Sequence, residues 1–446
     1  MFKYIFQLII LLGLCSAQAF EVQNVTASQR TDGSHIIDVC YDLAEDNVFV
    51  TFTAHAEISI DGGNSWEWLL INIKPNVIGD NVFPGNDKCF EFDADDYFSE
   101  TYTSQAQVKV MAYGHEAIDL PFEMVPVPAG EHSYYGYHAV NTSEFESVDE
   151  IRLIDYDYEI MKYPITNAQY AAYLIEQLET GKIFTHYTGD IKGEFSGYGP
   201  YEGMECEIYN PTDGNHSSCK TYATVSLAPG GISYLPDSYA CKQSLIMWNG
   251  TTFVVYEGYG NHPVGGISPV GAIEFARHYG LRLLDSFEWE KAARGTTTTL
   301  YPYWDELYLD PQRTNYKDSG DPWDDIILAM PGVPGSEGCG YNFDGTPSTT
   351  PVGFYNGQLY DGFQTLDAAS PYGAYDMIGN IKEMVSTLAG DEFASWGYNR
   401  FYYIGGSCHD GNDGAGYPIY SYGVAQLHEG TARVGIRCAR TINNSQ

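Results

Sequence analysis

Between Glu21 and about Phe122, short runs of alternating apolar and polar residues are separated by turn-forming clusters. Ile36 to Tyr41 and Val108 to Ala112 are typical runs, rich in β-branched and apolar residues. The cluster from Asp61 to Asn64 is a typical break between such runs. Because side chains in a strand alternate between the two faces of a sheet, this pattern predicts an antiparallel β-sandwich of about a hundred residues. We assign the sandwich to residues 20–123.

One turn in this region resembles an Asp-box, a hairpin motif of sialidases and many unrelated β proteins. Its sequence is Ser59-Ile60-Asp61-Gly62-Gly63-Asn64-Ser65-Trp66. In such a turn the Asp caps backbone N–H groups, Gly permits positive φ and Trp packs beneath. The motif is a local structural device and does not by itself predict a glycosidase.

The first nineteen residues have the features of a signal peptide. Lys3 precedes a largely apolar run from Tyr4 to Leu14, and Ala17-Gln18-Ala19 has the small-x-small pattern of a signal-peptidase site. The apolar run is too short for a spanning helix, and no later apolar run reaches about 18 residues. We therefore expect a secreted, extracellular protein without a membrane span, and we treat residues 441–446 as a short tail.

The charge balance excludes several classes of partner. The chain has 59 Asp and Glu but only 22 Lys and Arg, which gives a formal charge of -37. A surface this acidic repels nucleic acids and anionic lipids. The 38 Tyr residues favour a half-exposed aromatic surface. Five Asn-x-Ser/Thr sequons would make the chain a glycoprotein in a glycosylating host, at Asn24, Asn141, Asn215, Asn249 and Asn443.

Disulfides are the default state of cysteines in a secreted chain. Nine cysteines become eight once Cys15 leaves with the signal peptide. Cys40 and Cys89 both lie in strand-like runs, and we expect them to pair. Cys206 and Cys219 flank a turn-rich segment and would close a hairpin. The pairing of the other four stays open: Cys241, Cys339, Cys408 and Cys438.

A second unit extends from about residue 124 to residue 440 and mixes a few helices with many loops. Capping residues predict three helices, over about 168–178, over about 270–279, and from Ser286 to a stop at Gly295. The segment of about 185–260 is rich in Gly, Tyr, Asp and Ser and predicts a long loop-and-hairpin insertion. The expected fold class is therefore α+β, with an all-β N-terminal domain.

Six ordered pieces of this unit resemble the formylglycine-generating enzyme family, also called sulfatase-modifying factors. They are Tyr163 to Tyr170, His262 to Val264 leading into Gly280 to Leu283, Glu288 to Gly295, Ser370 to Asn380, Gly405 to Ser407, and Gly435 to Cys438. The resemblance implies a loop-rich variant of the C-type lectin fold over residues 124–440.

The resemblance also implies a possible chemistry. The family's enzyme oxidises a target cysteine with copper held by two cysteines, since Cu(I) prefers soft thiolates. Here the first of those positions falls on Asp410 and the second near Ala415, and a family Trp is replaced by Lys382. Ser407 and Cys408 are the catalytic candidates if the chain is an enzyme. A structural disulfide is the other expectation for Cys408. An iron-dependent branch needs a histidine cluster that the strand-rich N-terminal unit does not offer.

Structural Ca²⁺ is a further implication of the resemblance. Calcium prefers hard oxygen ligands, such as carboxylates, amides and carbonyls. The first expected ligand set combines the side chains of Asp376 and Glu383 with the carbonyls of Gly379 and Ile381. The second combines the side chains of Asn315 and Asp344 with the carbonyls of Tyr316 and Thr346. The alternative that Asp376 and Glu383 only cap turns stays open.

Two functional hypotheses follow. The first is a non-catalytic, calcium-stabilised extracellular module that binds a glycan or a protein, or self-associates. Aromatic candidates for ligand contact are Tyr198, Tyr201, Tyr256, Tyr259 and Tyr417. The second is a copper-dependent formylglycine-generating oxidase acting on a cysteine of a sulfatase-type substrate, in which Cys408 with another cysteine replaces the usual copper pair.

Overall fold

The computed structural model describes most of the chain beyond the predicted signal peptide. The described residues are 22–32, 34–44, 49–69, 77–94, 105–116, 119–141, 144–185, 190–193, 221–227, 244–248, 251–255, 257–297, 309–317, 319–323, 349–388, 400–408, 410, 423–426 and 434–442. Outside them lie Cys206, Cys219, Cys241 and Cys339, and the sequons at Asn215, Asn249 and Asn443.

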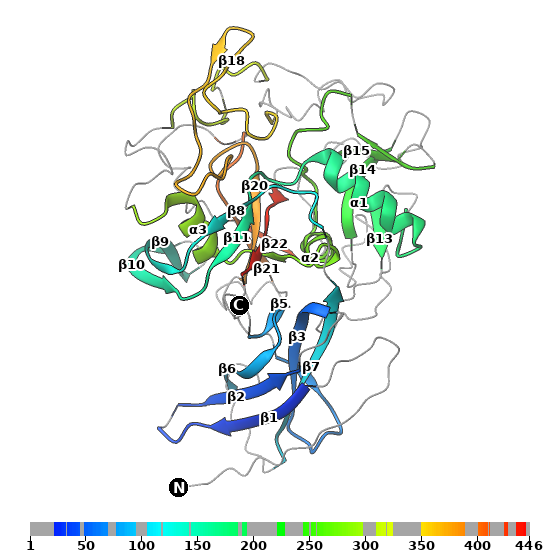
Figure 1. The fold of residues 1–446 in the computed structure, drawn as a ribbon, viewed down its shortest axis with the longest axis vertical. Coiled ribbons are helices and arrows are strands. Elements are labelled where there is room, and N and C mark those ends of the chain that lie inside the picture. The colour runs from blue at the N-terminus through cyan, green and yellow to red at the C-terminus, as the bar shows by residue number, and fades with distance from the viewer. Residues whose placement is uncertain are drawn as a thin grey trace.

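Two antiparallel sheets form the N-terminal part of the chain (Figure 1). One sheet contains β1 (Val22–Gln29), β2 (Ile36–Leu43) and β6 (Gly85–Asp93) in that order. In the other, β3 (Phe49–Ser59) pairs with β4 (Glu67–Trp68), β5 (Gly79–Val82) and β7 (Gln107–Glu116). Apolar side chains from both sheets, such as Val39 and Phe52, share one buried core. Two sheets packed around a common core are the arrangement that the alternating pattern predicts.

Cys40 and Cys89 form a disulfide between β2 and β6, which confirms the predicted pairing. The two residues are direct neighbours in the strand register. Their sequence separation is 49 residues. A crosslink of that loop length restricts the unfolded chain and stabilises the fold by about 4 kcal/mol in the chain-entropy model.

The turn that opens at Asp61 has the geometry that its sequence predicts. Asp61 Oδ1 accepts hydrogen bonds from the backbone N–H groups of Asn64 and Ser65, each 2.9 Å long. Gly63 has a φ of 90°, a conformation that favours glycine. The Trp66 side chain lies beside Gly63 and carries the Lys109 ammonium over its ring at 4.4 Å.

Asp61→Ala is expected to lower the thermal unfolding midpoint, because the N–H groups of Asn64 and Ser65 would lose their acceptor. The same hydrogen bonds, that from the Ser65 N–H first, lower the pKa of Asp61 to about 2. The stabilisation is therefore complete above the unfolded pKa of about 4 and is lost as the pH falls towards 2. Thermal melts of both proteins should show a gap at neutral pH that narrows near pH 2. A gap independent of pH would contradict this role for the carboxylate.

Three helices in the larger domain confirm the three predicted ones to within about a residue. They are α1 (Asn167–Glu179), α2 (Pro269–His278) and α3 (Ser286–Arg294). Thr166 and Gln169 form a capping box at the start of α1. Ser268 caps α2 and Asp285 caps α3, each by accepting a backbone N–H. Gly295, with a φ of 66°, ends α3.

Two four-stranded sheets form the centre of this domain. One has the order β17–β24–β11–β8 and contains β8 (Met124–Val127), β11 (Tyr158–Met161), β17 (Arg282–Leu283) and β24 (Cys438–Thr441). The other has the order β22–β21–β20–β23 and contains β20 (Lys382–Leu388), β21 (Arg400–Ile404), β22 (Gly423–Gln426) and β23 (Val434–Ile436). Residues of α1 and α2 share one buried core with these strands, and Trp289 of α3 belongs to a second core with Tyr158 and Ile404.

Most of the described residues of the predicted insertion lie in strands. A five-stranded sheet follows the order β12 (Ile183–Thr185), β13 (Asp190–Gly193), β14 (Thr221–Leu227), β15 (Ser244–Trp248) and β16 (Phe253–Val255). Two hairpins complete the domain, β9 (Gly130–Asn141) with β10 (Glu144–Ile154), and β18 (Leu359–Tyr360) with β19 (Phe363–Gln364). Helices together with strand-rich segments confirm the predicted α+β class.

Buried polar contacts join the two domains where β5 meets α2 and β24 (Figure 1). Asp80 accepts a hydrogen bond of 2.9 Å from Arg277 Nε, and both side chains are buried. Asn81 Nδ2 donates to the Gly280 carbonyl at 3.1 Å, and Asn81 Oδ1 accepts from the Thr441 N–H at 2.7 Å. The sandwich therefore contacts both a helix end and the last strand of the larger domain.

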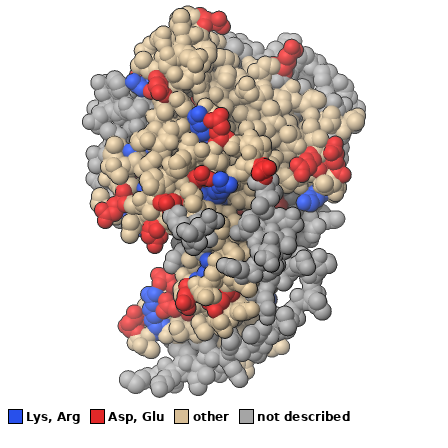
Figure 2. Space-filling view, viewed as in Figure 1, with Lys and Arg blue, Asp and Glu red and all other residues tan. Residues whose placement is uncertain are grey.

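The described surface agrees with the charge balance of the sequence. Figure 2 shows acidic side chains at several separate places on one face, with fewer basic side chains beside them. Among the described residues, the helices are too short or too polar to cross a membrane.

Candidate functional site

The loop that leads into β20 is the centre of the candidate site, and it is tightly curved. Asp376, Gly379 and Asn380 have φ values of 57°, 76° and 59°. A Cβ atom on Gly379 would lie 2.3 Å from the Asn315 carbonyl oxygen and 2.6 Å from Thr314 Cγ2, so glycine is required there. The Asn380 N–H donates to the same Asn315 carbonyl at 2.9 Å. The structure thus brings residues of the two predicted calcium sets, Gly379 and Asn315, into contact.

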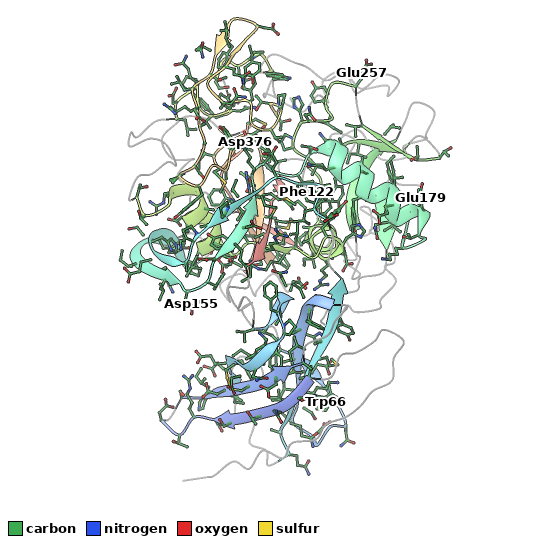
Figure 3. The ribbon with its side chains drawn as sticks, viewed as in Figure 1. Trp66, Phe122, Asp155, Glu179, Glu257 and Asp376 are labelled. Carbon is green, nitrogen blue, oxygen red and sulfur yellow. A yellow bond between two sulfur atoms is a disulfide. The ribbon has the colours of Figure 1, made fainter. Side chains whose placement is uncertain are left out.

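Asp376 is a buried carboxylate at the start of this loop (Figure 3). Its Oδ2 accepts a hydrogen bond of 2.6 Å from the Gly353 N–H. Burial raises the pKa of Asp376 to about 6, although Gly353 and Arg437 act in the opposite direction. A carboxylate whose ionised form is this poorly compensated favours a nearby cation.

Glu383 has a different environment from Asp376, since it is paired with Arg437. Arg437 Nη2 lies 2.8 Å from Glu383 Oε1, and both side chains are almost completely buried. Trp289 Nε1 donates to Glu383 Oε2 at 2.6 Å. The other Arg437 donors reach the carbonyls of Met161, Lys162 and Tyr375.

This network makes Glu383 the counter-ion of a buried arginine and leaves it few lone pairs for a metal. The donors to the Glu383 carboxylate are the side chains of Trp289 and Arg437, so this carboxylate does not cap a turn.

The donors around Asp376 fit Ca²⁺ only in part. One buried carboxylate and the carbonyls of Gly379 and Ile381 are hard oxygen donors of the type that calcium prefers. Glu383 is already neutralised by Arg437. In the second predicted set, Asn315 and Tyr316 are buried, whereas Asp344 and Thr346 lie outside the described residues. No group of three or more His, Cys, Asp or Glu suited to a metal occurs in the described part of the chain.

The Gly-Gly-Ser segment after β21 packs against this loop. The Gly379 N–H donates to the Gly405 carbonyl at 2.7 Å, and the Cys408 N–H donates to the Asn380 carbonyl at 3.1 Å. Ser407 is fully buried, and its N–H and Oγ both donate to Asp410 Oδ2, at 2.8 and 2.7 Å. The two catalytic candidates are therefore buried, and the Ser407 hydroxyl is hydrogen-bonded to a carboxylate.

Asp410 and Lys382 form an ion pair beside this segment. Lys382 Nζ lies 3.2 Å from Asp410 Oδ2, and the two side chains are 16% and 20% exposed. The Lys382 ammonium also lies over the Tyr403 ring at 5.5 Å. The Asp410 carbonyl accepts from the Lys317 N–H at 2.9 Å. Asp410 and Lys382, two of the positions at which the sequence departs from the family motif, thus contact each other as opposite charges.

Cys438 corrects the expectation that the cysteines of the mature chain are in disulfides. It is a free, fully buried thiol at the start of β24. Burial, and then the charge of Glu383, raise the pKa of the Cys438 thiol well above its usual range. The thiol stays protonated and packs as a small apolar side chain.

The aromatic candidates receive no support from the one that the structure describes. Tyr259 is buried, with its ring 4.6 Å from the His262 ring, and its carbonyl accepts from Asn167 Nδ2 at 3.0 Å. It packs inside the domain, which favours a packing role over contact with a ligand at the surface. The other four lie outside the described residues: Tyr198, Tyr201, Tyr256 and Tyr417.

Three roles were missed from the sequence: the arginine of the Arg437–Glu383 pair, the indole donor Trp289, and the contact between Lys382 and Asp410. Arg437 and Trp289 stand in the motifs Gly435 to Cys438 and Glu288 to Gly295, so their positions were visible in the sequence. Their partners are distant in the sequence and follow only from the fold.

Comparisons with known proteins give partial relatives. The chain is 29% identical over 161 residues to the serine/threonine-protein kinase pkn1 of Chlamydia caviae, a match that covers 36% of this chain and 19% of that protein. It is 42% identical over 59 residues to the uncharacterised protein YfmG of Bacillus subtilis, which covers 13% of this chain and 12% of that protein. The chain therefore matches less than a fifth of the length of either relative.

Solved structures with detectable likeness cover more of the chain. PvdO from Pseudomonas aeruginosa is 16% identical with a TM-score of 0.40, and the match covers 72% of this chain and 94% of that one. CarF is 18% identical with a TM-score of 0.38, over 73% of this chain and 100% of that one. The model of the sulfatase-modifying factor enzyme 1-like domain matches residues 114–442. Because that match spans well over half of the chain, the protein belongs to the formylglycine-generating-enzyme, or sulfatase-modifying factor, domain family.

Proposed function

We propose that this family member is secreted and non-catalytic, and that it acts as an extracellular binding or assembly module for a glycan or a protein. The ion pair between Lys382 and Asp410 is the observation that carries this proposal. It occupies the position that corresponds to the first copper cysteine of the family. A carboxylate neutralised by an ammonium group is a hard ligand that is already paired, whereas Cu(I) requires soft thiolates.

The neighbouring side chains support the same conclusion. The Ser407 hydroxyl donates a hydrogen bond to Asp410 Oδ2, and the Asp410 N–H donates one to the Ser407 carbonyl at 3.0 Å. These bonds close the segment into a turn around the carboxylate. The Asp410 side chain therefore has a structural role that a metal-binding thiolate in its place would not fill.

A Cu(I) titration tests the non-catalytic role. The reduced, full-length protein competes with a chromogenic Cu(I) chelator, and the expected result is that all copper stays with the chelator. A family member that retains both copper cysteines serves as the positive control. Stoichiometric transfer of copper to this protein would overturn the proposal and support the alternative oxidase built on Cys408.

Calcium stabilisation is the second part of the proposal. Asp376, with the carbonyls of Gly379 and Ile381, would hold the ion, and Ca²⁺ would supply the positive charge that the buried carboxylate lacks. The raised pKa of Asp376, about 6, supports this assignment. Glu383 would remain paired with Arg437.

This assignment predicts a pH dependence of stability without calcium that calcium largely removes. In EDTA, the raised pKa of Asp376 makes the folded state bind more protons than the unfolded state between about pH 4 and about pH 6. The free energy of unfolding should therefore fall as the pH rises from about 4 to about 6, by about 3 kcal/mol for a shift of about two pKa units. Saturating calcium should restore most of this loss above pH 6. Urea unfolding at each pH, with and without calcium, measures both effects.

Asp376→Asn removes one titrating group and should reduce the pH step over this window by the contribution of Asp376, and it should abolish the response to calcium. Asp285, whose pKa burial raises to about 7, is unchanged in this variant, so the comparison of the two proteins isolates Asp376. Asp361→Asn changes an exposed aspartate and should retain both effects. An equal response to calcium in wild type and Asp376→Asn would show that Asp376 is not a ligand.

A further inference from the structure

The hairpin of β9 and β10 extends from the larger domain as a sheet of two strands (Figure 1). Its strands pair antiparallel along their whole length, from Gly130 opposite Ile154 to Asn141 opposite Glu144. Within the described part of the chain, β9 is the sole strand paired with β10. The outer edge of β10 therefore presents backbone donors and acceptors for another strand.

One face of this hairpin is held against α3. Tyr134 meets Phe287 edge-on at 4.5 Å, and the Arg152 guanidinium lies over the same ring at 4.7 Å. Lys291 Nζ donates to the Gly130 carbonyl at 2.9 Å, and Arg294 Nη2 donates to the Ser133 carbonyl at 2.7 Å. The two basic residues of α3 thus fix the first strand by its backbone. The hairpin base is positioned by the domain and presents its other face to solvent.

The opposite face carries two large exposed apolar side chains. Ile151 and Leu153 are 65% and 66% exposed. They stand two residues apart, so they share the face opposite Arg152, which packs on α3. Single exposed apolar residues are common, but a neighbouring pair beside an open strand edge offers contacts for alternate side chains of an added strand.

The charge of β10 determines which partner fits. Its sequence contains Glu144, Glu146, Asp149 and Glu150 but one basic residue, Arg152. Exposed acidic residues also flank the apolar pair: Glu131 is opposite Leu153 in the register, and Asp155 follows β10 (Figure 3). A second copy is a poor partner, because its approach would bring together two chains of charge -37. An anionic lipid surface would be repelled in the same way.

We propose that the outer edge of β10 binds an extended, basic segment of a partner protein by strand addition. Backbone hydrogen bonds along β10 would supply affinity, and Ile151 and Leu153 would pack against alternate apolar side chains of the segment. Lys or Arg residues of the segment would lie near the exposed acidic residues that flank this pair, Glu131 and Asp155. This inference rests on the proposed binding role and adds the class of partner and the surface that receives it.

A peptide of about ten residues in which Lys and Val alternate is a suitable probe, since that length matches a long strand. Its binding to the full-length protein is measured by fluorescence anisotropy at low and at physiological salt. The expected result is binding that weakens as salt screens the charges. The double variant Ile151→Lys with Leu153→Lys should bind at least about tenfold more weakly, because it removes the apolar contacts and adds repulsion.

Leu359→Lys provides the matched control, because Leu359 is also an exposed apolar strand residue, on β18. It should bind the peptide like wild type, and a Glu–Val peptide should not bind. Equal binding by wild type and the double variant would overturn the assignment to β10, as would an absence of binding or equal binding of the acidic peptide. The Cu(I) titration reports separately on catalysis, so failure of the peptide assay leaves that part of the proposed function standing.

Discussion

Arg437→Gln should lower the free energy of unfolding by about 3 to 5 kcal/mol, the range for breaking a buried ion pair by removing one partner. Arg437 is fully buried and donates to Glu383 and to the carbonyls of Met161, Lys162 and Tyr375. Glutamine cannot reach all of these acceptors. Glu383 would be left ionised in the core, and three carbonyls from two segments would each lose a donor. Urea unfolding followed by circular dichroism measures the loss.

Arg440→Gln is the matched control, because Arg440 lies on β24, three residues after Arg437, and pairs with Glu159 while 43% exposed. A partly exposed pair contributes at most about 1 kcal/mol, so this variant should be close to wild type. Adding Glu383→Gln to Arg437→Gln should recover part of the loss, since the uncompensated charge is then gone. Equal destabilisation by the two arginine variants would show that the buried Arg437–Glu383 pair contributes no more to stability than the partly exposed Arg440–Glu159 pair.

Arg277→Gln should destabilise the contact between the sandwich and the larger domain by about 3 kcal/mol, because it leaves Asp80 buried without its cation. Asp80 retains a hydrogen bond of 2.8 Å from Thr53 Oγ1, which limits the loss. Asn81 still links the sandwich to Gly280 and Thr441. Differential scanning calorimetry should show one cooperative transition for wild type and two separated transitions for the variant, with the sandwich unfolding first.

Arg30→Gln is the control for the sandwich itself. Arg30 pairs with Asp38 and Glu91 on the surface of the same domain, away from α2. Its replacement should leave a single transition, because exposed pairs contribute little. Two transitions in wild type would show that the domains unfold independently despite the buried contacts.

The fold was predictable where the signal is local. Cap residues such as Thr166, Ser268 and Asp285 determine where helices begin, and each satisfies backbone donors within its own turn. Strand alternation and the Cys40–Cys89 pairing depend on neighbours along one or two strands. Patterns that depend only on residues close together in the chain or on adjacent strands can be recognised in a single sequence.

The site was predictable only in part, because its contacts join distant segments. Asp376 and Glu383 were expected to act alike, yet one is an under-compensated carboxylate and the other is the counter-ion of Arg437. The difference depends on Arg437, which lies between β23 and β24 near the end of the chain and which the fold brings beside Glu383. The burial of Tyr259 and the free thiol of Cys438 likewise follow from packing that spacing does not reveal. Secretion and calcium binding stay predictions.

The most direct test of the non-catalytic role is a search for formylglycine formation. The reduced protein, supplied with Cu(I) and oxygen, is incubated with a peptide that carries a sulfatase-type cysteine, and mass spectrometry follows the peptide. A family member with both copper cysteines provides the positive control. Because Asp410 and Lys382 are paired where the copper thiolate is required, the peptide cysteine should remain unconverted. Formation of the formylglycine peptide at the rate of the control would contradict this role.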